Sequence, residues 1–218
     1  IEKVLLGPSR RGRLITDKER SLTAYHEAGH ALVAASLKDS DPIHKISIVS
    51  RGRTGGFTLK LPLEEQRLKT RSQFLADLAM TLGGYAAEKI VFGDISTGAS
   101  NDLRQASDIA RSLVTRFGMS EKVGPIAFGK TEELIFLGRE ITTEKNYSEE
   151  SAALIDSEVR RFIDTAHRSA VRILTARRET LKVIAETLIK RETLEGDEFY
   201  ALIAQANAPA PVTSLPSA

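Results

Sequence analysis

The run His26-Glu27-Ala28-Gly29-His30 constrains this chain most, because it is an H-E-x-x-H pattern inside an apolar stretch that favours a helix. Four residues make about one helical turn, so both imidazoles lie on one face and reach a single metal ion. Glu27 lies about 100° round the axis and can address a water on that metal without being a ligand. The competing interpretation is a pair of half-buried histidines on an amphipathic helix. Since the chain has only four histidines and two fall on this pattern, we favour a zinc hydrolase site of the zincin type.

Composition narrows the class of protein. The chain has 218 residues, 41% hydrophobic and 28% charged, which is enough for one or two domains with cores. Its 31 basic and 29 acidic residues are spread evenly, so nothing indicates nucleic-acid binding. There is no cysteine, so His, Asp or Glu must hold any metal. No apolar run approaches the roughly 20 residues of a membrane span, and the chain starts at Ile1 rather than Met, so we expect a soluble fragment of a longer protein.

Periodicity predicts a mainly α (α+β) fold, with a small antiparallel sheet next to the H-E-x-x-H helix and a helical bundle from about residue 148. The predicted helices cover about Asp17 or Ser21 to Leu37, Ser72–Phe92, 103–117, Ser148–Leu174, 178–190 and a last one around Phe199–Ile203, and the predicted strands cover Ile43–Val49 and Phe57–Leu61. Gly83-Gly84 inside the second helix indicates close approach of another helix. Residues 1–207 are predicted to form the domain, and 208–218, rich in Ala, Pro and Ser, a flexible tail.

A catalytic zinc usually takes three protein ligands and a water, so a third ligand must come from elsewhere in the chain. The sequence offers four candidates. His44 lies on a predicted strand, where the role of a half-exposed strand residue explains it equally well. His167 lies on the long helix, where a structural role is favoured. Glu88 lies on the Gly-Gly helix, and Asp102 stands at the start of the next helix. Periodicity alone does not choose among them.

Four segments together are similar to the protease domain of the FtsH family of membrane-anchored, ATP-dependent zinc proteases. They are Ala24–Ala31, Ala86-Ala87-Glu88, Ser96–Leu103 and Phe117–Ser120, and the resemblance covers nearly everything from Ile1 to Ile203. It implies that Asp102 is the third zinc ligand and that Glu88 sits beside the metal and orients a ligand. Lys89 departs from the family, which commonly has a second acidic residue there.

The resemblance implies a zinc metalloendopeptidase with one Zn²⁺ per chain, held by His26, His30 and Asp102, and with Glu27 as the base that activates water. It further implies a homo-hexamer on the cytoplasmic side of a bacterial inner membrane, or in an organelle membrane, fed with unfolded or membrane proteins by an AAA+ ATPase domain of the same full-length chain. No G-x-x-x-x-G-K-[ST] nucleotide loop occurs here, so ATP would be used only by that absent domain.

Substrate binding and two alternative functions complete the expectations. Gly55, Gly56, Phe57 and Thr58 are candidates for a strand edge to which an extended peptide adds through main-chain hydrogen bonds. One alternative is an assembly module whose metal is structural or vestigial, and the other is an exopeptidase that uses the same metal chemistry. An intact Glu27 favours an open catalytic site over a closed structural one.

Overall fold

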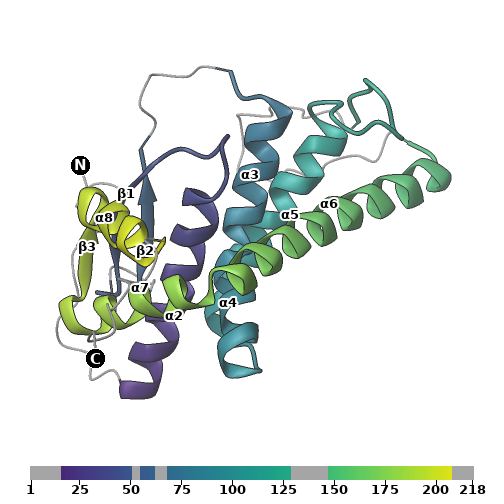
Figure 1. Ribbon diagram of the computed structural model, residues 1–218. Helices are drawn as coiled ribbons and strands as arrows, with labels where there is room; N and C mark the ends of the chain where they lie inside the picture. The colour runs from purple at the N-terminus through teal and green to yellow at the C-terminus, as the bar shows by residue number, and fades with distance from the viewer. Residues whose placement is uncertain (1–15, 51–54, 62–67, 129–146, 208–218) are drawn as a thin grey trace, which may run out of the picture.

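The computed structural model describes residues 16–50, 55–61, 68–128 and 147–207, and Figure 1 draws their arrangement. Within these ranges the elements are α2 (Asp17–Ala35), β1 (Ile43–Ser47), β2 (Phe57–Lys60), α3 (Arg71–Thr81), α4 (Gly83–Phe92), η1 (Thr97–Ala99), α5 (Ser100–Thr115), α6 (Glu149–Ala176), α7 (Arg178–Arg191), β3 (Thr193–Glu195) and α8 (Gly196–Asn207). The predicted mainly helical class with a small sheet is confirmed. The predicted tail at 208–218 lies outside the described residues. None of the described helices combines the length and apolarity that crossing a bilayer requires.

Helix α2, which carries the H-E-x-x-H pattern, forms the centre of the molecule (Figure 1). Its start is fixed by a capping box, in which Thr16 Oγ1 accepts from the Glu19 N–H at 3.2 Å and the Glu19 carboxylate accepts from the Thr16 N–H at 3.1 Å. Residues 26–34 are buried without interruption, because α3, α4 and α7 all pack on this helix. The two histidines therefore sit in the interior, where neighbouring elements fix their orientation.

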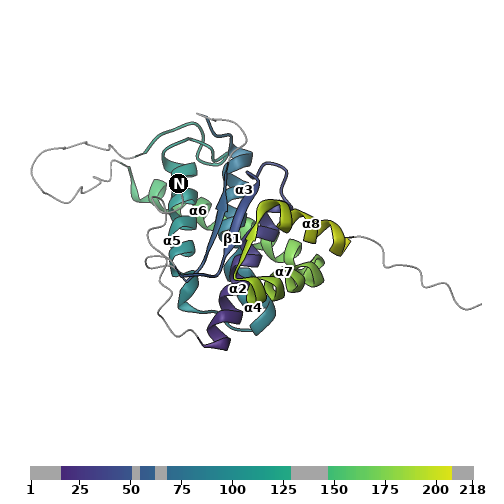
Figure 2. The ribbon, with the colours of Figure 1, turned by 90° about the vertical axis from the view of Figure 1, so that its left-hand side faces the viewer.

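The sheet has three antiparallel strands in the order β2-β1-β3. Strand β1 pairs with β2 through Ser47 and Phe57, and with β3 through Ser47 and Thr193. Both α2 and α8 pack against β1, as Figure 2 shows for α8. The two predicted strands are confirmed, whereas β3 was not predicted, because three residues following a helix are too few for a clear alternation. Strand β2 lies at one end of this order, next to the helix with the histidines.

The predicted single helix Ser72–Phe92 is wrong, because the structure divides it into α3 and α4 at Leu82. Apolar residues keep a helical period through the break, so periodicity does not reveal it. The predicted close approach at the glycine pair is confirmed: a Cβ built on Gly83 would lie 2.8 Å from the Gly29 carbonyl oxygen, and one on Gly29 would lie 2.5 Å from the Gly83 oxygen. Contact between these two backbones brings α4 onto α2.

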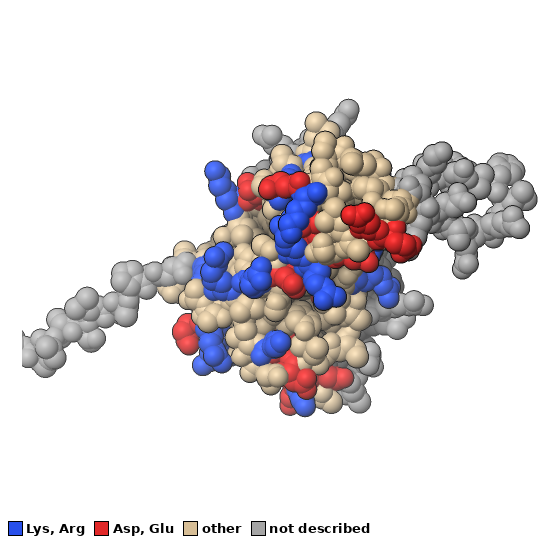
Figure 3. Space-filling model, turned by 90° about the vertical axis from the view of Figure 1, so that its right-hand side faces the viewer, with Lys and Arg blue, Asp and Glu red and all other residues tan. Residues whose placement is uncertain are grey.

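The long helix α6 begins where the sequence predicts it, with Ser148 Oγ accepting from the Ser151 N–H at 3.2 Å. It packs against α3, α4 and α5. Buried Glu158 on α6 accepts hydrogen bonds from Ser120 at 2.6 Å and from Arg161 at 2.7 and 2.8 Å, which ties the turn after α5 to this helix. On the face drawn in Figure 3, basic and acidic side chains are intermixed.

Candidate metal centre

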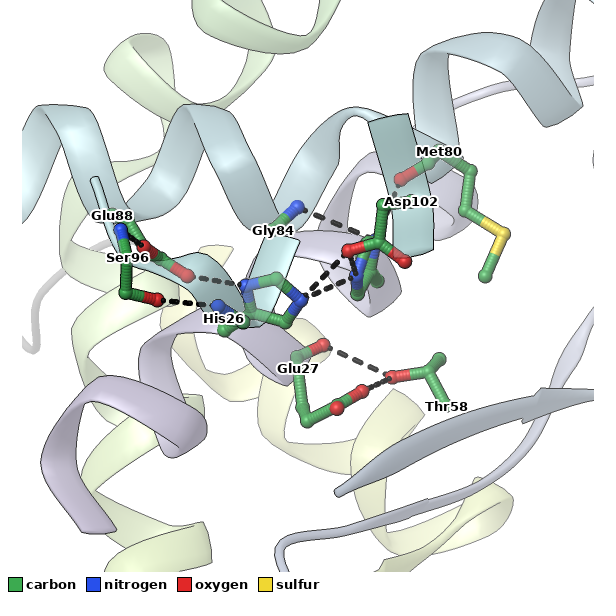
Figure 4. A network of polar contacts seen from close by, with 10 residues as sticks. His26, Glu27, Thr58, Met80, Gly84, Glu88, Ser96 and Asp102 are labelled. Carbon is green, nitrogen blue, oxygen red and sulfur yellow. Dashed lines mark hydrogen bonds and ion pairs between the residues drawn. The ribbon is translucent and has the colours of Figure 1, made fainter. Parts of the chain in front are cut away.

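The two histidines of α2 each have their Nδ1 atom occupied by an acceptor. His26 Nδ1 lies 2.7 Å from Glu88 Oε1, and His30 Nδ1 lies 2.8 Å from the Met80 carbonyl oxygen (Figure 4). A carbonyl only accepts and an ionised carboxylate only accepts, so both Nδ1 atoms carry the proton. A second approach, from the Gly84 N–H to His30 Nδ1 at 3.3 Å, is longer and does not change this assignment. Once its ring is neutral, each histidine therefore offers the lone pair of Nε2, as a metal ligand does.

Asp102, in the first turn of α5, brings a carboxylate to these two lone pairs. Its Oδ2 lies 3.0 Å from His26 Nε2 and 3.3 Å from His30 Nε2, and the two Nε2 atoms are 3.0 Å apart. Oδ2 is buried and accepts no hydrogen bond among the described residues. Three acceptors that face one another in the interior repel unless a cation or proton lies between them. The donor set of two imidazoles and one carboxylate fits zinc, and three protein ligands are the number typical of a catalytic zinc site.

The pKa values of His26 and Asp102 agree with this need for a positive charge at the cluster. Burial lowers the pKa of His26, but the carboxylates of Asp102 and Glu88 outweigh burial and raise it to about 10. Burial likewise raises the pKa of Asp102, and the two imidazoles more than reverse that effect, so the pKa of Asp102 lies below its usual range. A metal at this position must therefore displace a proton, as histidine sites generally require.

Glu27, the next residue along α2, is buried beside the cluster. Its Oε2 accepts a 2.7 Å hydrogen bond from Thr58 Oγ1 on β2, as Figure 4 shows. A Cβ built on Gly56 would lie 2.9 Å from Glu27 Oε1, so the carboxylate occupies the space that a side chain there would need. Burial raises the pKa of Glu27, which the neighbouring imidazoles and Thr58 only partly offset. A carboxylate with a raised pKa suits proton transfer.

Glu88 on α4 is fully buried and hydrogen-bonds to His26 rather than joining the three facing acceptors. Its second oxygen accepts from the Ser96 N–H at 2.6 Å. Burial raises the pKa of Glu88, but these bonds and the imidazole lower it overall. The arrangement fixes the ring of His26, as expected of a carboxylate that orients a metal-binding histidine. Lys89, where the sequence departs from the FtsH pattern, is exposed.

The other two candidates for third ligand lie away from the cluster. His44 is exposed on β1, and the ring of His167 on α6 packs edge-on against Tyr85 at 5.6 Å between centroids. Sequence reasoning did not identify the Met80 carbonyl and the Ser96 N–H, because backbone groups leave no residue-type signal. The role of Gly84 was only partly visible: a Cβ there would lie 2.5 Å from the ring of His26.

A groove of about 900 Å³ contains the cluster. It is lined by Gly55, Gly56, Phe57 and Thr58 together with His26, Glu27, His30, Glu88 and Asp102. Of the residues predicted for the substrate strand, Phe57 and Thr58 lie on β2, at one end of the sheet order, and Gly55 and Gly56 come directly before it.

Fold and site together define a metallopeptidase domain of the zincin class: a helix carries H-E-x-x-H, and a second helix supplies a carboxylate at the cluster. The profile of peptidase family M41 matches residues 13–202, and the chain belongs to that family.

Named relatives agree with this membership. The chain is 52% identical over 202 residues to "ATP-dependent zinc metalloprotease FtsH 1" of Thermomicrobium roseum, covering 93% of this chain and 31% of that protein. It is 50% identical to the FtsH 1 protein of Sphaerobacter thermophilus, with the same coverage, and 45% identical over 206 residues to FtsH of Thermotoga maritima, covering 94% of this chain and 34% of that protein. The chain thus spans about a third of the length of these relatives.

Proposed function

We propose that this chain is a zinc-dependent endopeptidase, the proteolytic part of an ATP-dependent protease, and that it cleaves unfolded polypeptides. The observation that carries the proposal is the convergence of the two histidine Nε2 atoms and the Asp102 carboxylate within 3.3 Å, beside a buried Glu27. Membership of family M41 and the relatives' names support it. In this proposal His26, His30 and Asp102 hold one zinc ion per chain.

When bound, zinc would supply the Lewis acidity that makes a water more acidic. The chain's own residues then handle the proton. Glu27 takes it on a carboxylate oxygen and passes it to the departing amine, while Thr58 holds the carboxylate in place through the 2.7 Å bond to Oε2. Glu88 holds the ring of His26, and the Met80 carbonyl holds that of His30. These contacts keep both imidazoles in the required tautomer.

Substrate is proposed to bind as an additional strand along residues 55–58. Strand β2 pairs with β1 on one side, and on the other side it borders the groove that holds the cluster. Main-chain hydrogen bonds to a strand edge accept many sequences, which suits a protease for unfolded chains. A Cβ on Gly56 would meet both Glu27 and the Ser47 carbonyl oxygen, so a side chain there would push the strand away from the base.

The longer protein is proposed to add the parts that this chain lacks. The relatives are named as ATP-dependent, and no nucleotide loop occurs in this sequence, so an AAA+ ATPase domain of the same full-length chain would unfold and deliver substrates. Following the resemblance to FtsH, we place the full-length protein as a homo-hexamer on the cytoplasmic side of a bacterial membrane. The fragment alone would cleave unfolded or short peptides without using ATP.

Digestion of unfolded casein, with and without a chelator, tests the proposed activity. Internal cleavage that chelation abolishes and zinc restores is expected. Release of single residues would instead identify an exopeptidase, and no cleavage by a zinc-loaded sample would indicate a structural site. Glu27→Gln keeps the three proposed ligands and removes the base, so it should bind zinc at the wild-type ratio and lose cleavage. An active Glu27→Gln variant would overturn the mechanism.

A further inference from the structure

A second hollow, of about 440 Å³, lies between α3 and α5, which run side by side in Figure 1. Its apolar lining comes from Phe74, Ile109 and Phe117, and its polar lining includes Arg104 and Asp108. This hollow contains none of the proposed metal ligands. The catalytic proposal therefore does not use it.

The hollow adjoins the groove that contains the candidate metal ligands. Phe74, Asn101, Gln105 and Ile109 line both cavities, so the two cavities share a wall. Helix α5 contributes to both, with Asp102 at the cluster and Ile109 two turns further on. Seven residues of helix rise about 10 Å, the length of about three residues of extended chain.

The chemistry of the hollow favours a large apolar side chain. Phe74 and Phe117 stack with their ring centroids 5.1 Å apart, and Phe117 remains 41% exposed. Lys69 Nζ lies 5.6 Å from the Phe74 ring and the guanidinium of Arg116 lies 5.5 Å from the Phe117 ring, so cations flank the aromatic floor. An aromatic or long aliphatic side chain placed on this floor removes apolar surface from water on both partners.

We infer that this hollow, the α3–α5 subsite, binds a large apolar side chain of the polypeptide substrate about three residues from the scissile bond. The inference rests on the proposed protease function and adds a sequence preference to it. Main-chain pairing along residues 55–58 accepts any sequence, whereas the α3–α5 subsite distinguishes apolar from polar side chains. Cleavage would then be favoured in segments that a folded protein buries.

The test compares quenched fluorescent peptides that differ at one position. Each carries Phe or Ser two, three or four residues from the cleavage site, on either side, and kcat/KM is measured for the wild type, Phe117→Ala and Phe117→Leu. The matched control is Phe92→Ala, because Phe92 is 40% exposed and also contacts one ring, that of Tyr25 at 5.6 Å. It is absent from the lining of both cavities.

Wild type and Phe92→Ala are expected to prefer Phe over Ser about tenfold at one of these positions, the size that filling an apolar pocket gives. Phe117→Ala should lose this preference and Phe117→Leu should restore most of it. Chelator-sensitive cleavage with no preference in the wild type, or a preference that Phe117→Ala keeps, would overturn the subsite and leave the protease function intact. No cleavage of any peptide would instead defeat the protease function itself. Sedimentation of the same variants checks one other role. If Phe117→Ala keeps the preference but sediments as a smaller species than the wild type, the hollow is a contact between copies of the chain.

Discussion

Replacing Gly84 by alanine should damage the metal site and spare the fold. A Cβ at this position would lie 2.5 Å from Cε1 and Nε2 of His26, whereas non-bonded heavy atoms prefer about 3.5–4.0 Å. The ring is held between Glu88 at 2.7 Å and Asp102 at 3.0 Å, so it has to shift by about 1 Å and leave those partners. Metal–ligand distances tolerate only about 0.2 Å. A misplacement of about 1 Å costs about a hundredfold in rate.

The chain offers a matched comparison in the preceding residue. Gly83→Ala places its Cβ 2.8 Å from the backbone oxygen of Gly29, and backbone cannot move aside as a side chain does. Gly83→Ala should therefore lower the melting temperature of the metal-free chain. Gly84→Ala should not lower it, since alanine favours a helix by up to about 1 kcal/mol over glycine. Zinc affinity by chelator competition and casein cleavage complete the assay. A Gly84→Ala variant with wild-type zinc affinity and kcat would refute the reasoning.

Three further changes test other parts of the site and fold. Thr58→Val removes the 2.7 Å hydrogen bond to Glu27 and should lower kcat about tenfold at unchanged zinc content. Thr58→Ser keeps a hydroxyl and should stay close to the wild type in steady-state kinetics. A wild-type kcat in Thr58→Val would exclude a role of Thr58 in positioning Glu27. Glu88→Gln should weaken zinc binding about 10–100-fold in chelator competition, and unchanged affinity would show that Glu88 does not orient the histidine. Arg161 lowers the pKa of buried Glu158 from 4.5 to about 2, so the carboxylate stabilises the fold above pH 4.5 and this contribution disappears as pH falls toward 2. Glu158→Gln should accordingly lose about 1–2 kcal/mol in denaturant unfolding at pH 7 and much less at pH 2.5, whereas an equal loss at both would contradict the pKa argument.

The sequence predicted those helices and strands whose position depends on capping residues and on the spacing of apolar residues nearby in the chain. The N-cap residue Ser148 and apolar periodicity placed the start of α6 within a residue, periodicity gave the start of α2 as Asp17 or Ser21, and alternation found β1 and β2. The break at Leu82 stayed hidden because contact between Gly83 and Gly29, distant in sequence, decides where α4 packs. Strand β3 depends on pairing with β1 rather than on its own three residues.

The cluster of candidate metal ligands was predictable in part for a related reason. His26 and His30 lie on one helix, so their spacing alone shows that they converge. Asp102 reaches them only because α5 begins beside α2 in the folded chain. The residue pattern therefore did not distinguish Asp102 from the other candidates for third ligand, which were His44, His167 and Glu88. The resemblance to FtsH selected Asp102, and its Oδ2 lies within 3.3 Å of both Nε2 atoms. The resemblance also predicted Glu88 beside the metal ligands, and in the structure Glu88 hydrogen-bonds to His26 Nδ1.

Anomalous X-ray scattering at the zinc edge, from crystals of protein purified without a metal column, tests the central claim most directly. The account predicts one zinc peak per chain, in contact with Nε2 of His26, Nε2 of His30 and a carboxylate oxygen of Asp102, with Glu88 still bound to His26 Nδ1. A peak ligated by Glu88 in place of Asp102, or zinc bound only away from the two histidines, would contradict it.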